Sequence, residues 1–174
     1  MIVEGDNVMG KIINLDGLTG TQHVKAKYSN KLMWELKDFF AKHDEGYYNE
    51  REKEGILCKY FRLGNNICIK AEIAVRQNDF LCDTEMAPII KELSRDEELK
   101  LLRKINEINN ELDYGYFALA NRDGDVVVVY KTYFEQEEGI DCFDGLDKLI
   151  GYPMGMIEQY GVSILACVGI EVSV

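Results

Sequence analysis

The alternation of apolar and polar positions is clearest between residues 67 and 76. Every second residue there is apolar and most of the others are polar, which is the period of a strand with one buried face. The turn sequence Gly-Asn-Asn at 64–66 joins it to an apolar run at 55–63, so the two segments are predicted to form a hairpin. A second turn at 77–79 leads to a predicted third strand over 80–86.

Two segments have apolar residues at helical spacing. The first is predicted to begin at Ser29 or Asn30, either of which can cap a helix, and to end near Gly46. The second opens with a capping box made by Ser94 and Glu97. The apolar face of the first helix comprises Leu32, Trp34, Leu36, Phe39 and Phe40, and that of the second Leu99, Leu102, Ile105, Ile108 and Leu112.

A second hairpin is predicted around Asn121-Arg122-Asp123-Gly124, which apolar runs flank on both sides. We interpret Asp123-Gly124 as a tight turn. A calcium loop is the alternative, but with Gly124 at its sixth position Leu119 and Tyr130 occupy ligand positions that need carboxylates.

The last helical region is predicted to start after Asp141 or Asp144. Pro153 is expected to break or kink it, because proline lacks the N–H that a helix needs and strains the preceding turn. The pattern at 162–168 fits either a helix or a strand.

The predicted order is therefore α-β-β-β-α-β-β-α. Short turns between strands indicate a mainly antiparallel sheet, and the helices must cover one of its faces, which defines an α+β fold. The 174 residues suit a single domain, which we assign to 28–174. The glycine-punctuated residues 1–27 are expected to form an N-terminal extension or arm.

Charge and composition restrict the function further. With 20 Lys and Arg against 31 Asp and Glu, the chain carries a net charge of −11 and has no basic stripe, which argues against binding nucleic acid. The N-terminus does not resemble a signal peptide and no apolar run approaches ~20 residues, so we expect a cytoplasmic protein that does not enter membranes. Five cysteines without a Cys-x-x-Cys motif are expected to be reduced, mostly buried thiols: Cys58, Cys68, Cys82, Cys142 and Cys167.

No catalytic arrangement stands out among the titratable residues. His23 and His43 have no partner nearby in the sequence. Asp141, Asp144 and Asp147 recur every three residues and could face a cation together, but helix capping is the better interpretation. We therefore expect no cofactor, no metal site and no enzymatic activity.

Three segments together resemble the YbjN-like family of bacterial proteins: Ile105–Asn109, Tyr116–Leu119 and Asp123–Val126. The resemblance implies that family's fold, which is related to the type III secretion chaperones. Members are loosely described as sensory-transduction or motility regulators, and the related chaperones bind protein partners as homodimers. Asn106 and Asn109, one turn apart in the first segment, are expected to have a structural role, by bonding to the following hairpin or by bordering solvent.

These observations predict a non-enzymatic protein-binding module, chaperone-like or regulatory. It would use a sheet face, a sheet edge or an apolar groove near the first helix. The candidate binding residues are aromatic: Trp34, Phe39, Tyr47 and Tyr48. One alternative is a small-molecule sensor or small enzyme with a carboxylate-lined pocket using Asp141, Asp144 or Glu107. A structural subunit of a larger assembly is the other alternative.

Overall fold

The computed structural model describes residues 28–43, 46–64, 66–87, 90, 93–122, 124–137 and 142–171. The predicted arm at 1–27, with His23, lies outside the described residues, as do Asp123 and Asp141.

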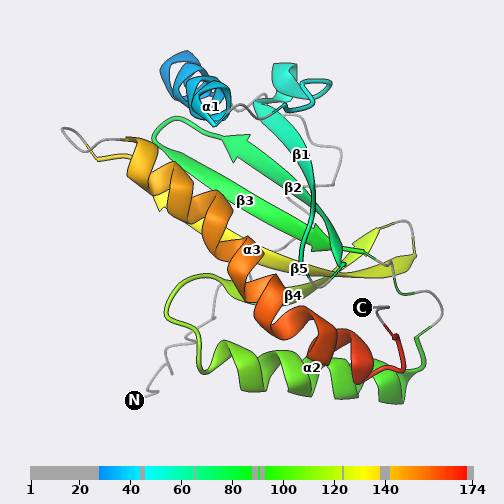
Figure 1. Cartoon of the computed structure of the whole chain (residues 1–174). Coiled ribbons are helices and arrows are strands. Elements are labelled where there is room, and N and C mark those ends of the chain that lie inside the picture. Colours follow the sequence, from blue (N-terminus) through cyan, green and yellow to red (C-terminus); the bar gives the residue numbers. More distant parts are fainter. Residues whose placement is uncertain are drawn as a thin grey trace, which may run out of the picture.

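The described residues form three helices and a five-stranded antiparallel sheet (Figure 1). The elements are α1 (Asn30–Lys42), β1 (Ile56–Arg62), β2 (Cys68–Val75), β3 (Asp79–Met86), α2 (Arg95–Asn109), β4 (Tyr116–Arg122), β5 (Asp125–Glu135) and α3 (Cys142–Ala166), with a short 3-10 helix, η2 (Glu52–Glu54), before β1. This confirms the predicted α+β class and the order of elements. The strands are arranged β1-β2-β3-β5-β4, so β1 and β4 are the edges.

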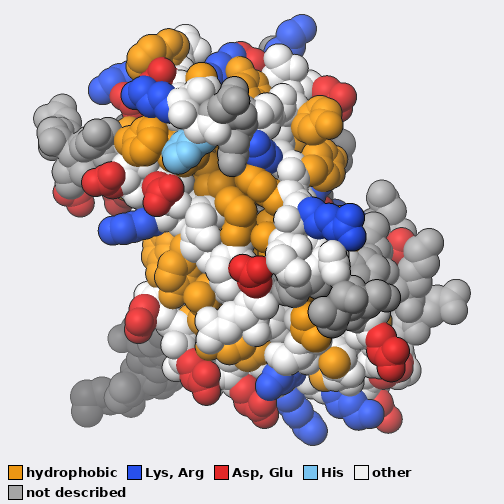
Figure 2. Space-filling view, viewed as in Figure 1, with side chains coloured by type: hydrophobic (Ala, Val, Ile, Leu, Met, Phe, Trp, Pro, Cys, Tyr) orange, Lys and Arg blue, Asp and Glu red, His pale blue; other side chains and the backbone are white. Residues whose placement is uncertain are grey.

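The helices pack against one face of the sheet. α3 runs diagonally across it, α1 lies near one of its ends and α2 lies beside β4 (Figure 1). The predicted apolar side of β2 faces these helices and is buried, with Ile69, Ile73 and Val75 at most 4% exposed. Viewed from the helix side, hydrophobic side chains gather in the middle of the molecule and charged ones lie mainly around the rim (Figure 2). Within the described residues, no helix is both long and apolar enough to cross a membrane.

The first helix differs from its prediction in two respects. Ser29 caps it as expected, its Oγ accepting a hydrogen bond from the Leu32 N–H (3.3 Å), but the helix ends at Lys42 rather than near Gly46. Met33 is buried where Trp34 was expected, and Trp34 is 64% exposed. Both positions fit a helical stripe, and the packing of α1 on the sheet and α3 selects Met33.

The capping box of α2 is confirmed, because Ser94 and Glu97 each bond the other's backbone N–H. Its predicted apolar face is partly wrong, since Leu99 and Leu102 are exposed while Leu101 is fully buried. The stripe that faces the core is Leu101, Ile105 and Ile108, at helical spacing.

Pro153 does not break α3, which continues as one helix to Ala166. The missing proline N–H would normally bond the carbonyl of Leu149, four residues earlier. That carbonyl instead accepts a hydrogen bond from the buried Thr132 Oγ1 of β5 (2.9 Å). The predicted break is therefore wrong, because a neighbouring strand supplies the donor that proline lacks.

The β4–β5 hairpin is confirmed as a tight turn. Arg122 pairs with Asp125, and Gly124 has a φ of +94°, a conformation that favours glycine. Asn121 Oδ1 accepts a hydrogen bond from the Gly124 N–H (3.0 Å) and so stabilises the turn.

Candidate binding site at the open edge of strand β1

Strand β1 has one side that pairs with β2 and one that faces outward. The Val75 N–H bonds the Gly55 carbonyl, and the Leu63 N–H bonds the Ile67 carbonyl, at the two ends of the β1–β2 pairing. Because hydrogen-bonded residues alternate in an antiparallel pair, the backbone groups of residues 57, 59 and 61 point toward β2. Those of 56, 58, 60 and 62 therefore point away from the sheet.

The described residues cover only part of this outer edge. The Tyr48 N–H donates to the Cys58 carbonyl (2.7 Å) and the Cys58 N–H donates to the Tyr48 carbonyl (3.0 Å), an antiparallel bridge. Two residues further on, no described residue bonds the outward backbone groups of Tyr60 and Arg62. Among the described residues, the edge is therefore open where β1 ends.

Two exposed tyrosines mark the boundary between the covered and the open part. The side chains of Tyr48 and Tyr60 are 57% and 58% exposed, and their rings meet edge to face with centroids 5.3 Å apart. Exposed aromatic rings beside unpaired strand groups are typical of surfaces that bind protein.

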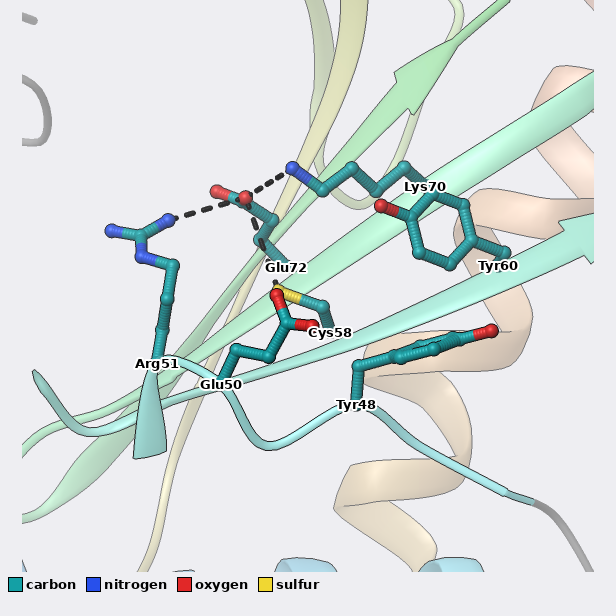
Figure 3. A pocket seen from close by; sticks show the side chains of 7 residues that line it. All are labelled: Tyr48, Glu50, Arg51, Cys58, Tyr60, Lys70 and Glu72. Atoms are coloured by element: carbon teal, nitrogen blue, oxygen red, sulfur yellow. Dashed lines mark hydrogen bonds and ion pairs between the residues drawn. The ribbon is translucent and has the colours of Figure 1, made fainter. Parts of the chain in front are cut away.

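A hollow of about 280 Å³ adjoins this edge on the sheet face away from the helices. Its lining residues come from β1, β2 and the segment before η2: Tyr48, Glu50, Arg51, Cys58, Tyr60, Lys70 and Glu72. Figure 3 shows Arg51 and Lys70 both reaching toward Glu72, with the two tyrosine rings at the other end.

Glu72 is the centre of the polar part of this hollow. Its Oε1 lies 2.5 Å from Lys70 Nζ and 3.2 Å from Arg51 Nη1, and the Cys58 Sγ lies 4.0 Å from the same oxygen. The Glu72 side chain is only 15% exposed, so its charge depends on these partners.

Electrostatics keep the cluster ionised and the thiol protonated. Burial by itself would raise the pKa of Glu72, but the Lys70 hydrogen bond and the charges of Lys70 and Arg51 outweigh it, so the pKa is lowered. Burial would lower the pKa values of Lys70 and Arg51, but their bonds to Glu72 and Glu54 and the nearby negative charges raise both. Burial and the Glu72 charge raise the pKa of Cys58, which leaves little thiolate at neutral pH. The hollow is thus lined on one side by ion-paired polar groups, and its Cys58 thiol is not activated as a nucleophile.

The same face of the sheet carries further ion pairs. Lys131 Nζ lies 2.6 Å from Asp83 Oδ2, and Arg122 Nη2 lies 2.5 Å from Glu85 Oε1. Glu72 pairs across the strands with Asp83, and Asp83 with Lys131, so charged residues form a row over three neighbouring strands.

The opposite edge, β4, is closed where it starts. The Asn109 Nδ2 donates to the Phe117 carbonyl, and the Phe117 N–H donates to Asn109 Oδ1, both at 2.8 Å. The side-chain amide thus replaces a neighbouring strand. Asn109 thus bonds to the following hairpin, which is one of the two structural roles predicted for it. Asn106 is exposed on α2.

The predicted aromatic residues do not form one surface. Trp34 and Tyr48 are exposed, Trp34 beside α3 and Tyr48 at the β1 edge. Phe39 is 5% exposed and belongs to the core, and Tyr47 is half-buried with its ring stacked on Phe40 (5.5 Å). Phe39 is therefore unavailable to a partner in the folded protein.

Of the seven residues that line the hollow, the sequence prediction named only Tyr48 as a binding residue and missed the other six: Glu50, Arg51, Cys58, Tyr60, Lys70 and Glu72. The alternation along β1 and β2 places Tyr60, Lys70 and Glu72 on the face opposite the apolar one. This pattern could have indicated them, but nothing local connects Arg51 with Glu72.

The other titratable candidates lie apart from one another. Asp144, Asp147 and Glu107 are exposed on α3 and α2, and none of them lines this hollow. His43 follows α1, with its ring stacked on that of Phe143 (5.2 Å). In the part of the chain that the structure describes, no group of three His, Cys, Asp or Glu side chains is placed to hold a metal ion.

The cysteines are all unpaired, and their burial differs. Cys58, Cys82 and Cys142 are buried, Cys167 is half-buried and Cys68 is exposed, which agrees with the expectation of mostly buried thiols. Burial raises the pKa of the Cys82 thiol to about 12.

Comparison with known proteins supports the fold. No protein-family model and no curated protein sequence matches the chain. The crystal structure of YbjN from E. coli, described as a candidate transcription regulator, is similar with a TM-score of 0.53 and 12% sequence identity. The match covers 74% of this chain and 90% of that one. The chain therefore has a YbjN-like fold, as the resemblance implied.

Proposed function

We propose that this protein is a non-enzymatic protein-binding module that takes up an extended segment of a partner along the open edge of β1. The observation that carries the proposal is the pair of outward-facing residues Tyr60 and Arg62, whose backbone groups no described residue bonds. The bridge between Tyr48 and Cys58 supports it, because the chain already pairs one extended residue with this edge.

Binding would use the physics of sheet extension. An added strand gains main-chain hydrogen bonds at Tyr60 and Arg62, and its alternate side chains would lie against the exposed rings and the polar hollow. The ion pairs around Glu72 keep the hollow in one shape before binding, which lowers the entropy lost on association. The net charge of −11 favours encounters with basic partners.

A regulatory role through protein contacts fits these features best. YbjN is described as a candidate transcription regulator, and the negative charge of this chain disfavours direct contact with DNA. We place the protein in the cytoplasm and expect a homodimer. The sensor or enzyme alternative has less support, because Glu72 is held by two cations and the exposed Asp144 and Glu107 lie on different helices.

The test combines a backbone variant with hydrogen exchange. The wild-type protein and Y60P serve as baits in an extract of the source cells, and proteins that bind only the wild type are purified and mixed with it. Proline removes the outward N–H of residue 60 without removing a bond to β2. In the complex, the amides of Tyr60 and Arg62 should become protected from exchange.

Y60A is the matched control, since it removes the ring but keeps the N–H. A partner that binds by strand addition should tolerate Y60A better than Y60P. Equal binding to all three proteins, or a complex in which the amides of 60 and 62 exchange as before, would contradict the proposal.

A further inference from the structure

A second hollow lies between α1 and the first turns of α3. It measures about 300 Å³ and is lined by Trp34, Glu35, Asp38, Lys42, Cys142, Phe143 and Leu146. The α1 residues recur at helical spacing and so share one side of that helix. Where these two helices meet, at the upper left of Figure 2, charged side chains of both signs surround hydrophobic ones.

The hollow is apolar at its base and has an aromatic residue on its rim. Leu146 and Cys142 are buried, whereas Trp34 is the most exposed large hydrophobic residue described. Leaving an indole ring in water costs hydrophobic free energy that a bound group would recover.

In one half of the hollow, a cation of the protein itself is already bound. Lys42 Nζ lies 2.8 Å from Asp38 Oδ2 and 5.5 Å from the centre of the Phe143 ring. A cation thus lies between a carboxylate and an aromatic face, an arrangement in which both attract it.

The other half has the same two chemical groups, Glu35 and Trp34. Glu35 Oε1 lies 3.7 Å from Lys31 Nζ, but the Lys31 side chain is 80% exposed and this pair is weak. Glu35 Oε2 is buried and has no hydrogen-bond partner among the described residues. A buried carboxylate oxygen without a donor is costly, and the terminal torsion of a glutamate turns easily, so a partner that draws this oxygen toward a donor in the hollow would be stabilising.

We propose that this hollow binds an arginine side chain of a partner protein, with its guanidinium over Trp34 and bonded to Glu35. Arginine fits better than lysine, because its planar group stacks on an aromatic ring while donating several hydrogen bonds to a carboxylate. The inference goes beyond the β1 edge: it concerns a separate surface and specifies a residue type in the partner.

Trp34 is the only tryptophan of the chain, so its fluorescence reports on this hollow alone. The probes are two peptides, acetyl-Gly-Leu-Arg-Leu-Gly-amide and the same peptide with citrulline, which has nearly the shape of arginine without its charge. The arginine peptide should change the Trp34 emission in a saturable way, and the citrulline peptide should bind at least about tenfold more weakly.

Variants of the full chain locate the effect. E35Q should weaken binding of the arginine peptide by about tenfold. E107Q, which removes an exposed carboxylate from α2, should leave it unchanged. Circular dichroism of each variant separates lost binding from lost folding, and E35D replaces E35Q if the latter fails to fold.

Four results would overturn the inference. The two peptides could bind equally or not at all, or E35Q could bind like the wild type. The emission could also change with the concentration of the protein alone, which would make a second copy of the chain the occupant. If the arginine peptide fails to bind but the amides of Tyr60 and Arg62 are still protected from exchange in the partner complex, only this inference fails and the β1 proposal remains.

Discussion

The two edge strands of the sheet differ in how their outward backbone N–H and C=O groups are bonded. At β4 the outward backbone groups of Phe117 are bonded by the Asn109 amide of α2. At β1 the Tyr48 bridge covers Cys58, and the edge is then open at Tyr60 and Arg62. An edge is normally a liability, because unpaired strand groups invite other chains.

The difference shows at which residues a polar side chain bonds the backbone groups of an edge strand. Phe117 is 1% exposed, so unbonded groups there would be buried and costly. Tyr60 and Arg62 are exposed, so water can satisfy their groups until a partner replaces it. Closure therefore follows burial rather than the choice of edge, since no described residue bonds the outward backbone groups of Leu119 and Asn121 on β4 either, and both of these residues are at least partly exposed.

The largest effect is expected from proline substitutions on β1. F61P removes an N–H that points toward β2 and also the half-buried ring of Phe61, so it should cost about 3 kcal/mol or more. Y60P removes an N–H that points outward and an exposed ring, so it should cost much less. Urea unfolding of the two variants measures the difference.

The comparison of edges depends on this alternation. If Y60P were as unstable as F61P, the outward groups of residue 60 would be needed for folding, and β1 could not be an open edge.

The next effect concerns the two hydrogen bonds that close β4 at Phe117. N109A removes both bonds to Phe117 and should reduce the free energy of unfolding by about 2 kcal/mol or more, because two buried groups lose their partners. N106A, one turn away and exposed, should change it by less than about 0.5 kcal/mol. Thermal and chemical unfolding of both variants would reveal this contrast, and similar stabilities would mean that α2 packing alone closes β4.

The sequence predicted those parts of the fold that depend on neighbours in the chain. The alternation from 67 to 76 and the Ser94–Glu97 capping box are local patterns, and both were confirmed. The choice between Met33 and Trp34 is not local, because it depends on how α1 packs against α3 and the sheet.

The same limit applies to the candidate site. Tyr48 was identified as an aromatic residue, but its bridge to Cys58 requires the chain to turn back on itself. The grouping of Arg51 with Glu72 also arises only when the segment around η2 packs against β1 and the Arg51 side chain reaches β2. The break predicted at Pro153 was wrong for a similar reason, since the donor that replaces the missing proline N–H belongs to β5.

The third expected effect concerns Thr132 and Pro153. Here too a side chain bonds a backbone group that would otherwise be unpaired, the Leu149 carbonyl. T132V should cost about 1–2 kcal/mol, because the Leu149 carbonyl loses its donor. In the P153A background the restored N–H can bond that carbonyl, so the same substitution should cost less. A double-mutant cycle by urea unfolding measures the coupling, and simple additivity would show that Thr132 does not compensate for the proline.

The smallest effect tests whether the ion pairs at Glu72 help to hold the β1 edge in shape. The pKa of Glu72 is lower in the folded protein than its ordinary value of 4.5, because Lys70 and Arg51 outweigh the effect of burial. As the pH falls, the unfolded chain therefore binds a proton at this residue before the folded protein does, which favours unfolding. The contribution of Glu72 should be complete above about pH 4.5 and should decline as the pH falls toward the folded-state pKa. The difference in free energy of unfolding between the wild type and E72Q should thus be largest near neutral pH and should shrink in acid, with E107Q as the control for removal of an exposed charge. A difference that grew in acid would mean that Glu72 is stabilised by protonation, and the polar side of the hollow beside the open edge would then not be ion-paired.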